Sequence, residues 1–149
     1  MKILFACSTG GHLTQLYRMR PWWEAHDRVW VTFANSQSES LLRGERMYAA
    51  YAPTTRNIPN AARNLGLALR VLRSERPDIV ISDGAGVAVP FFVVARMAGI
   101  RTAYVEVYDR ITRPTLSGRM CYPLADLFLL QWPEQAESYP RGQVVGGLL

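Results

Sequence analysis

The sequence is poor in cysteine and histidine, and this scarcity limits the chemistry that the chain can carry. The two cysteines, Cys7 and Cys121, stand far apart, and there are only two histidines. No pair of these residues has the spacing of metal ligands, so the sequence predicts no metal site. Cys7 lies in an apolar run and Cys121 in a mixed one, which favours buried free thiols in a reducing compartment.

A long apolar run is also missing. Residues 87–100 form the longest apolar stretch, and Pro90 and Arg96 interrupt it, so it is too short and too broken to span a bilayer. Behind Met1 and Lys2, only a few apolar residues precede a glycine turn, which is unlike a signal peptide. We therefore expect a cytoplasmic protein.

The composition is typical of one globular domain over residues 1–149, with 49% hydrophobic and 19% charged residues. The net charge of +5, from 17 basic and 12 acidic residues, favours an anionic partner: nucleic acid, a phosphorylated ligand or an acidic membrane. Nucleic acid is the least favoured, because the arginines are dispersed and no recognition-helix motif is present.

Strand-like and helix-like segments alternate along the chain. Predicted strands cover residues 2–7, 28–33, 47–52, 78–82, 101–106, 126–131 and 143–145, and predicted helices cover 13–24, 36–43, 58–72, 87–98 and 114–123. This alternation predicts a Rossmann-like α/β fold, with a mainly parallel sheet and helices on both faces. Ligands of such sheets bind beyond the carboxyl ends of the strands.

Two of these helices carry more detailed expectations. Ser36 is the predicted N-cap of the helix over 36–43. The helix over 58–72 has an apolar face that is predicted to be buried, and an arginine stripe on the opposite face. The face consists of Ile58, Ala61, Ala62, Leu65, Ala68, Leu69 and Leu72, and the stripe of Arg56, Arg63 and Arg70.

The first predicted strand leads into the turn Ser8, Thr9, Gly10, Gly11 and His12. This turn is neither a Walker loop nor a GxGxxG fingerprint, but glycine N–H groups at the start of a helix suit a phosphate. The helix dipole would disfavour the protonated form of His12, and a neutral imidazole can act as a general base. The alternative is a purely structural turn, with His12 as a cap or a surface residue.

Two further clusters follow later strands. Asp83, Gly84 and Gly86 form a second glycine turn, in which Asp83 is a predicted helix cap; the alternative is again a structural turn. Glu106, Tyr108, Arg110 and Ser117 form a polar cluster after the strand over 101–106, and the alternative is a loop held by its own ion pairs. Two glycine turns at one sheet edge favour a shared phosphate site.

In this order, the three clusters resemble those of one family, the acceptor-binding, membrane-recruiting subunits of two-part GT-B glycosyltransferases. The family includes the PssD-type proteins of exopolysaccharide and capsule synthesis and a subunit of the eukaryotic dolichol-linked N-acetylglucosamine transferase. Its members are similar to the N-terminal half of MurG. Gly10, Gly11 and His12 match a Gly-Gly-His turn, residues 82–90 match a second glycine turn, and residues 106–119 match a Glu-centred loop.

The resemblance implies that this chain binds a polyprenyl-diphosphate-linked sugar, while a separate catalytic subunit binds the nucleotide sugar. The turns and the polar cluster would hold the acceptor and its diphosphate with no metal and no cofactor. These residues are Ser8, Thr9, Gly10, Gly11, Asp83, Gly84, Gly86, Tyr108, Arg110 and Ser117. His12 would take the proton of the acceptor hydroxyl, with Glu106 as the alternative base.

The resemblance also implies a peripheral protein on the inner face of the plasma membrane. The eukaryotic subunit has an N-terminal membrane anchor, whereas this sequence starts at its first strand, so we expect surface contact with the membrane. The candidate contacts are Arg18, Arg20, Trp22, Trp23, Arg63 and Arg70. The alternative is tryptophans that cap the core and a solvated arginine face. Two other functions stay open: a non-catalytic scaffold for the partner, and a stand-alone nucleotide-binding protein.

Overall fold

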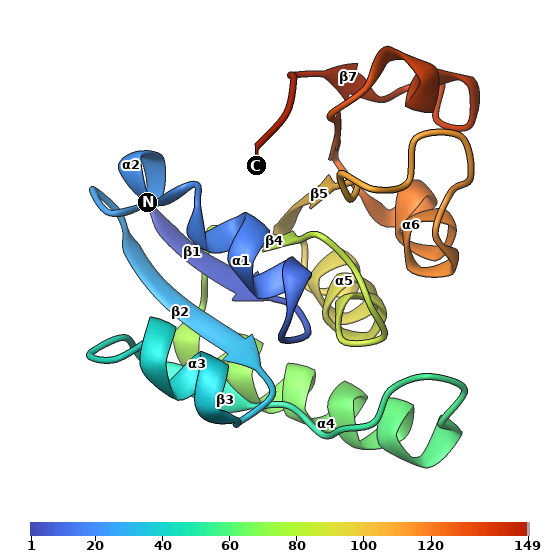
Figure 1. Ribbon diagram of the computed structural model, residues 1–149. Helices are drawn as coiled ribbons and strands as arrows, with labels where there is room; N and C mark the ends of the chain where they lie inside the picture. The colour runs from blue at the N-terminus through green and yellow to red at the C-terminus, as the bar shows by residue number, and fades with distance from the viewer. Residues whose placement is uncertain (149) are drawn as a thin grey trace.

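The computed structural model describes residues 1–148 and contains one seven-stranded sheet in which all strands are parallel (Figure 1). The strand order is β3-β2-β1-β4-β5-β6-β7. The strands are β1 (Lys2–Ala6), β2 (Asp27–Thr32), β3 (Met47–Ala49), β4 (Ile79–Ser82), β5 (Arg101–Val105), β6 (Leu127–Leu130) and β7 (Gln143–Val144). All seven predicted strands are confirmed.

Helices cover both faces of the sheet. They are α1 (Gly11–Tyr17), α2 (Arg20–Trp23), α3 (Ser36–Leu41), α4 (Ile58–Glu75), α5 (Ala88–Met97) and α6 (Leu116–Cys121), with short 3₁₀ helices η1 (Tyr122–Leu124) and η2 (Pro133–Glu137). Side chains of α1 and α2 contribute to one apolar cluster, and those of α4, α5 and α6 to the other. The predicted Rossmann-like fold is therefore confirmed.

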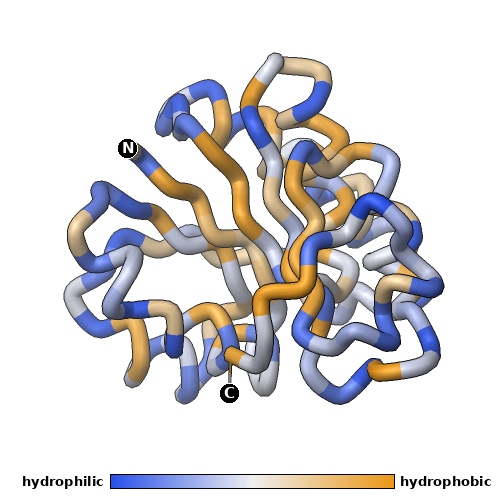
Figure 2. The backbone as a smooth tube through the Cα atoms, turned by 90° about the horizontal axis from the view of Figure 1, so that it is seen from above, coloured by the Kyte–Doolittle hydropathy of each residue, from blue (hydrophilic) through white to orange (hydrophobic). Residues whose placement is uncertain are grey.

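The two apolar clusters explain why the central strands are apolar throughout. On β1, Leu4 and Ala6 belong to the cluster under α4 and α5, whereas Ile3 and Phe5 belong to the cluster under α1. Successive strand residues point to opposite faces, and here both faces are covered. In Figure 2 the apolar strands run through the middle of the molecule and hydrophilic connections surround them.

The predicted helix over 13–24 is wrong in one respect, because it is interrupted. The helix α1 ends at Tyr17, and α2 begins at Arg20 with Pro21 in its first turn. Proline has no N–H to continue an α-helix but fits the first turn of a new one. Ser36 is not the N-cap of α3: Asn35 holds that position, and its side chain accepts a hydrogen bond from the Ser38 N–H.

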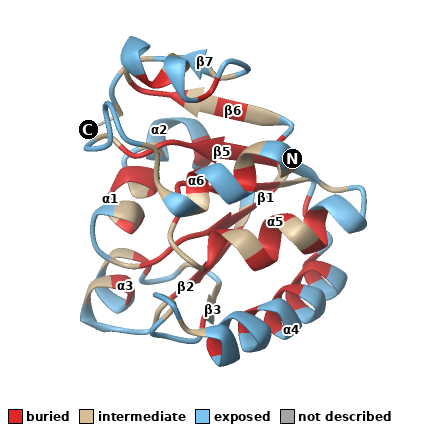
Figure 3. Cartoon of the chain, turned by 90° about the vertical axis from the view of Figure 1, so that its right-hand side faces the viewer, coloured by how far each residue is buried: buried red, intermediate tan, exposed pale blue. Residues whose placement is uncertain are grey.

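The buried face of α4 also differs from the prediction. Of the predicted face, Ala68 and Leu72 are buried as expected, but the other five residues are exposed, Ile58 to 82%, and Asn60 and Asn64 are buried instead. The two asparagines are buried because they make hydrogen bonds to the loop before α4. Asn64 accepts from the Tyr51 N–H and donates to the Tyr51 carbonyl, and Asn60 Nδ2 donates to the Pro53 carbonyl. These bonds attach the preceding loop to the covered side of α4, while Ile58, Leu65 and Leu69 lie on its outer surface, which Figure 3 shows as largely exposed.

Within residues 1–148, no helix has the length and apolar character needed to cross a membrane. Both cysteines are buried and free, as the sequence predicts.

Candidate functional site

The candidate site lies at the carboxyl edge of the sheet, where β1, β4 and β5 end side by side. The turn after β1 leads into α1, the turn after β4 leads into α5, and the loop after β5 leads into α6 (Figure 1). The strand order therefore brings together the three clusters that the sequence singles out, as the doubly wound topology predicts.

His12 and Asp83 form the central pair of this site. His12 Nδ1 lies 3.1 Å from the Asp83 carbonyl oxygen and 3.4 Å from Asp83 Oδ1. The His12 side chain is 27% exposed, whereas that of Asp83 is completely buried. Since Nδ1 faces Asp83, the other ring nitrogen, Nε2, is left without a protein partner among residues 1–148 and remains able to meet a ligand.

A buried relay of side chains holds Asp83 in place. Gln15 Nε2 donates to Asp83 Oδ2 at 3.0 Å, and Gln131 Nε2 donates to Gln15 Oε1 at 2.7 Å. Gln131 Nε2 also donates to the Glu106 carbonyl at 2.9 Å, which connects the relay to the loop after β5. Asp83 is not a helix cap: α5 has no side-chain cap, so this prediction is wrong.

The protonation of the pair differs from the expectation for His12. Burial raises the pKa of Asp83 to about 6, against the opposing effect of His12. Burial alone would lower the pKa of His12, but the hydrogen bond and the charge of Asp83 outweigh it, and the pKa of His12 is raised. The neighbouring carboxylate, rather than the helix dipole, therefore sets the basicity of this imidazole.

The second turn depends on glycine because other side chains approach it closely. Gly84 has φ of 121°, and a Cβ atom there would lie 2.6 Å from Tyr104 Oη and 3.0 Å from Ser117 Oγ. The same atom would lie 3.4 Å from His12 Cε1, so Ser117 and His12 flank one turn. A Cβ at Gly86 would lie 2.6 Å from Thr54 Cβ, so Gly86 allows close packing of the loop before α4.

The first turn uses part of its backbone internally. Gly10, with φ of 87°, donates its N–H to Gln37 Oε1, and its carbonyl accepts from Gln37 Nε2. Thr9 Oγ1 accepts from Asn35 Nδ2, and Ser8 is buried. The Gly10 N–H is therefore already satisfied, whereas α1 has no side-chain cap at its N-terminus.

Glu106 is fully enclosed. Its carboxylate accepts hydrogen bonds from Tyr139 Oη, Thr115 Oγ1 and the Val107 N–H, at 2.5, 3.2 and 2.9 Å. A Cβ at Gly118 would lie 2.6 Å from Glu106 Oε2, so α6 closes the carboxylate off. These contacts position the loop and α6, and of the two candidate bases only His12 is then accessible to a ligand.

The remaining residues of the polar cluster separate into two places. The Tyr108 ring packs on Trp132, with 4.9 Å between the ring centroids, and the Tyr108 carbonyl accepts from Trp132 Nε1. Arg110 instead lines a hollow of about 420 Å³ together with Arg113 and Arg119.

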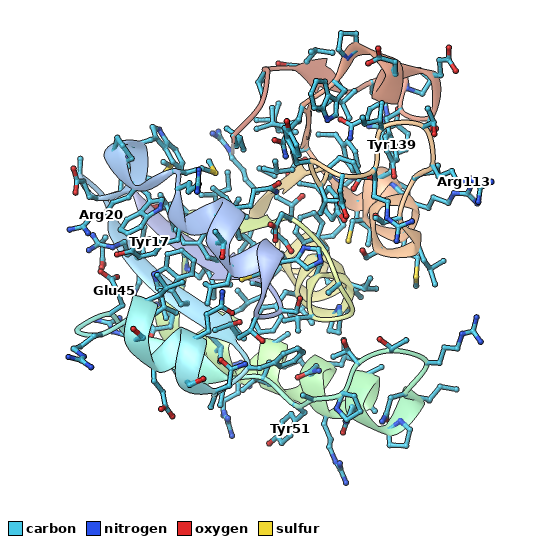
Figure 4. All side chains as sticks on the ribbon, in the orientation of Figure 1. Tyr17, Arg20, Glu45, Tyr51, Arg113 and Tyr139 are labelled. Carbon is cyan, nitrogen blue, oxygen red and sulfur yellow. The ribbon has the colours of Figure 1, made fainter. Side chains whose placement is uncertain are left out.

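The candidate membrane contacts lie on different sides of the molecule. Arg18, Arg20 and Trp22 are exposed near α2, but Trp23 is 1% exposed and belongs to the core, so it is unavailable for surface contact. Arg63 and Arg70 are exposed on α4. Figure 1 shows α2 and α4 at opposite ends of the view, and Figure 4 places Arg20 far from Tyr51, which precedes α4. The candidate contacts therefore form two separate groups on the surface.

Residue patterns do not reveal the relay behind Asp83. Gln15 and Gln131 are buried glutamines in unrelated parts of the chain, and neither belongs to a motif. Only the fold brings them together, 116 residues apart in sequence. Within residues 1–148, no cluster of three or more potential metal ligands is present.

Solved structures with a similar fold include MurG and UDP-N-acetylglucosamine 2-epimerases. The chain superposes with a TM-score of 0.72 on MurG from Acinetobacter baumannii, at 17% identity, covering 89% of this chain and 42% of MurG. It superposes with a TM-score of 0.76 on S. aureus MnaA in its UDP complex, at 17% identity, covering 97% of this chain and 44% of MnaA. The fold is thus that of one Rossmann-like half of a GT-B enzyme.

The chain belongs to the family described as "oligosaccharide biosynthesis protein Alg14 like", whose model matches residues 5–148. It is 26% identical over 180 residues to the human UDP-N-acetylglucosamine transferase subunit ALG14, covering all of this chain and 83% of the human protein. It is 31% identical over 118 residues to the Eremothecium gossypii ALG14 subunit, covering 73% of this chain and 53% of that protein. The chain thus spans about half the length of some of its curated relatives.

Proposed function

We propose that this chain is the acceptor-binding subunit of a two-subunit glycosyltransferase that builds a lipid-linked oligosaccharide. The observation that carries the proposal is the His12–Asp83 pair at the carboxyl edge of half a GT-B fold. The relatives are named as subunits of a UDP-N-acetylglucosamine transferase, which supports a partner that binds the nucleotide sugar. The family description favours an oligosaccharide product over an exopolysaccharide or a capsule.

In the proposed mechanism, His12 acts as the general base. An acceptor hydroxyl beside Nε2 loses its proton to this nitrogen as the oxygen attacks the anomeric carbon of the donor sugar, and the nucleoside diphosphate leaves. Asp83, on Nδ1, fixes the orientation of the ring and stabilises the imidazolium that forms. Ser117 and the Gly84 turn lie next to His12 and would contact the acceptor sugar. No cofactor enters this mechanism.

We further propose that α4 is the membrane contact. Its outer surface combines the exposed apolar side chains of Ile58, Leu65 and Leu69 with Arg63 and Arg70. Apolar residues beside arginines are typical of a helix that lies in the interface of an anionic membrane. The inner face of the plasma membrane, our expected location, provides such a surface.

Reconstitution with the nucleotide-sugar-binding partner tests the proposal. We expect His12→Ala to lower kcat by about 10²-fold or more, since general base catalysis contributes that much. His26→Ala is the matched control, because His26 lies beside α2 at the other edge of the sheet and its ring packs near Trp22. Glu106→Gln should leave kcat largely unchanged, because Glu106 is enclosed, although the NH₂ group of glutamine cannot accept the hydrogen bond of either Tyr139 or the Val107 N–H and the fold should lose some stability. Full turnover by His12→Ala would refute the assignment of the base.

A second candidate function is a non-catalytic scaffold that anchors its partner at the membrane. The exposed side chains of Ile58, Leu65 and Leu69 on α4 favour this function independently of the site. The partner alone, supplied with a water-soluble acceptor, separates the two functions. Turnover by the partner alone at the rate of the complex supports the scaffold, whereas turnover that requires this chain and His12 supports the acceptor-binding subunit.

A further inference from the structure

The hollow beside α6 is formed by one short segment of the chain. It has a volume of about 420 Å³ and is lined by Arg110, Arg113, Pro114, Leu116 and Arg119. The segment leaves β5, passes the hollow and enters α6, so a single loop conformation sets the position of all three guanidinium groups. Figure 4 labels Arg113 at the outer end of this segment.

These three arginines have no acidic partner among residues 1–148. Four other arginines do have acidic partners, namely Arg20, Arg28, Arg46 and Arg96; for example, Arg28 Nη2 lies 2.6 Å from Glu45 Oε1, and Arg46 Nη1 lies 2.6 Å from Glu75 Oε2. By contrast, no ion pair or side-chain hydrogen bond involves the guanidinium groups of the hollow in the described part of the chain. Several unpaired guanidinium groups around one hollow attract a polyanion, and their planar donors fit phosphate oxygens.

Leu116 lines the hollow, and two other apolar side chains of the same segment are exposed as well. Leu116 is 73% exposed, Met120 is 48% exposed and Ile111 is 40% exposed. Leu116 and Met120 are four residues apart on α6 and therefore lie on one face of it. A hydrocarbon chain attached to a phosphate can cover these apolar side chains and remove them from water.

The hollow is close to the candidate site. Ser117, which follows Leu116 directly, has its Oγ next to the Gly84 turn that also contacts His12. Less than one helical turn of α6 therefore separates the arginine-lined side from the side that faces His12. A diphosphate in the hollow and a sugar beside His12 would therefore both lie next to α6.

We propose that Arg110, Arg113 and Arg119 bind the diphosphate of a polyprenyl-linked ligand, with its first isoprene units over Ile111, Leu116 and Met120. This inference rests on the proposed function, because it assigns the diphosphate of the acceptor to this hollow. It also limits the role of the first glycine turn, whose Gly10 N–H already donates to Gln37. The loop after β5 thus becomes the principal anion site.

Calorimetric titration of the full chain, without a partner, tests the proposal with geranyl diphosphate, inorganic diphosphate and UDP as probes. We expect geranyl diphosphate to bind about tenfold more tightly than inorganic diphosphate, because its chain buries apolar surface. Arg113→Glu and Arg119→Glu should each weaken both ligands by about tenfold or more. Leu116→Ser should weaken geranyl diphosphate only.

Arg101→Glu is the matched control, because it makes the same change of charge at an exposed position where β5 begins, at the opposite edge of the sheet. An equal loss of affinity in Arg101→Glu would show a general charge effect and overturn the proposal. Binding of UDP as tight as that of geranyl diphosphate would assign the hollow to a nucleotide and overturn it too.

The proposed function is tested separately by turnover. Suppose that turnover depends on His12, but that Arg113→Glu and Arg119→Glu still bind geranyl diphosphate normally. That result would refute this site and would not count against the proposed function. Inactivity of every reconstituted complex, with specific geranyl diphosphate binding intact, would count against the proposed function and not against the site.

Discussion

At the scale of the residue, Asp83 is the group on which the candidate site depends. It is buried beside His12 and is held by Gln15, so its carboxylate has a fixed orientation toward the imidazole. The charge of this carboxylate raises the pKa of His12, although burial acts in the opposite direction. A base assisted in this way is active once the pH exceeds the raised pKa of His12.

The substitution Asp83→Asn tests this dependence in the reconstituted complex. Asparagine carries no charge, so the pKa of His12 should fall and the ascending limb of the kcat/KM profile should move to lower pH. The value of kcat should also fall, by about tenfold or more, because the ring loses the group that stabilises its protonated form. An ascending limb at the same pH as in the unchanged protein would show that Asp83 does not act through His12.

At the scale of the element, α4 shows where sequence patterns mislead. Its apolar residues recur at helical spacing, which predicts a buried face, yet Ile58, Leu65 and Leu69 are exposed. The spacing is correct for a helix and gives no information on which face is covered. The covered side carries Leu67, Ala68, Val71 and Leu72 together with Asn60 and Asn64, and these two asparagines satisfy the backbone of a loop whose path is known only from the fold.

The exposed stripe of α4 gives a prediction on membrane binding. In sedimentation with vesicles rich in anionic lipid, Leu65→Glu and Leu69→Glu should each lower the bound fraction of the protein several-fold, because each removes apolar contact and adds negative charge. Met97→Glu is the control, since Met97 is 79% exposed at the end of α5 and outside the stripe. Equal losses in all three variants would refute α4 as the contact.

The predictable part of the site follows from the same reasoning. The three clusters and their convergence could be predicted, because the carboxyl ends of adjacent parallel strands meet at one edge. The pairing of His12 with Asp83 and the enclosure of Glu106 could not, since both depend on side-chain contacts between distant segments. The sequence also offers Trp23 as a surface residue beside Trp22, but its side chain packs in the core.

At the scale of the whole molecule, Glu75 connects α4 to β1 and to the strand β3 at the edge of the sheet. Lys2 Nζ and Arg46 Nη1 lie 2.8 and 2.6 Å from Glu75 Oε2, and Tyr48 Oη donates to Oε1. Hydrogen bonds from Lys2 and Tyr48, with help from Arg46, lower the pKa of Glu75 from 4.5 to about 2. The carboxylate therefore stabilises the fold only while it is ionised.

The pH dependence of unfolding follows from this shift. The contribution of Glu75 is fully present above its unfolded pKa of 4.5 and is lost as the pH falls toward about 2. We expect Glu75→Gln to lower the free energy of unfolding at pH 7 by about 1–2 kcal/mol. This is less than the full pKa shift implies, because solvent screens the interaction with the exposed Arg46. Urea unfolding should show this difference shrinking between pH 5 and pH 2. A difference that stays constant over that range would contradict the ionic origin of the effect.

The hydrogen bond from the Leu148 N–H to Gln131 Oε1 has a consequence for observing the molecule. Gln131 also donates to Gln15, and Gln15 donates to Asp83, so the last described residues and the His12 imidazole lie at two ends of one continuous chain of polar contacts. The nuclear magnetic resonance signal of the His12 ring should therefore respond to a change in the position of Leu148. We expect a partner that displaces the segment after β7 to shift the titration of His12 without contacting the imidazole, so that the shift detects binding of the partner.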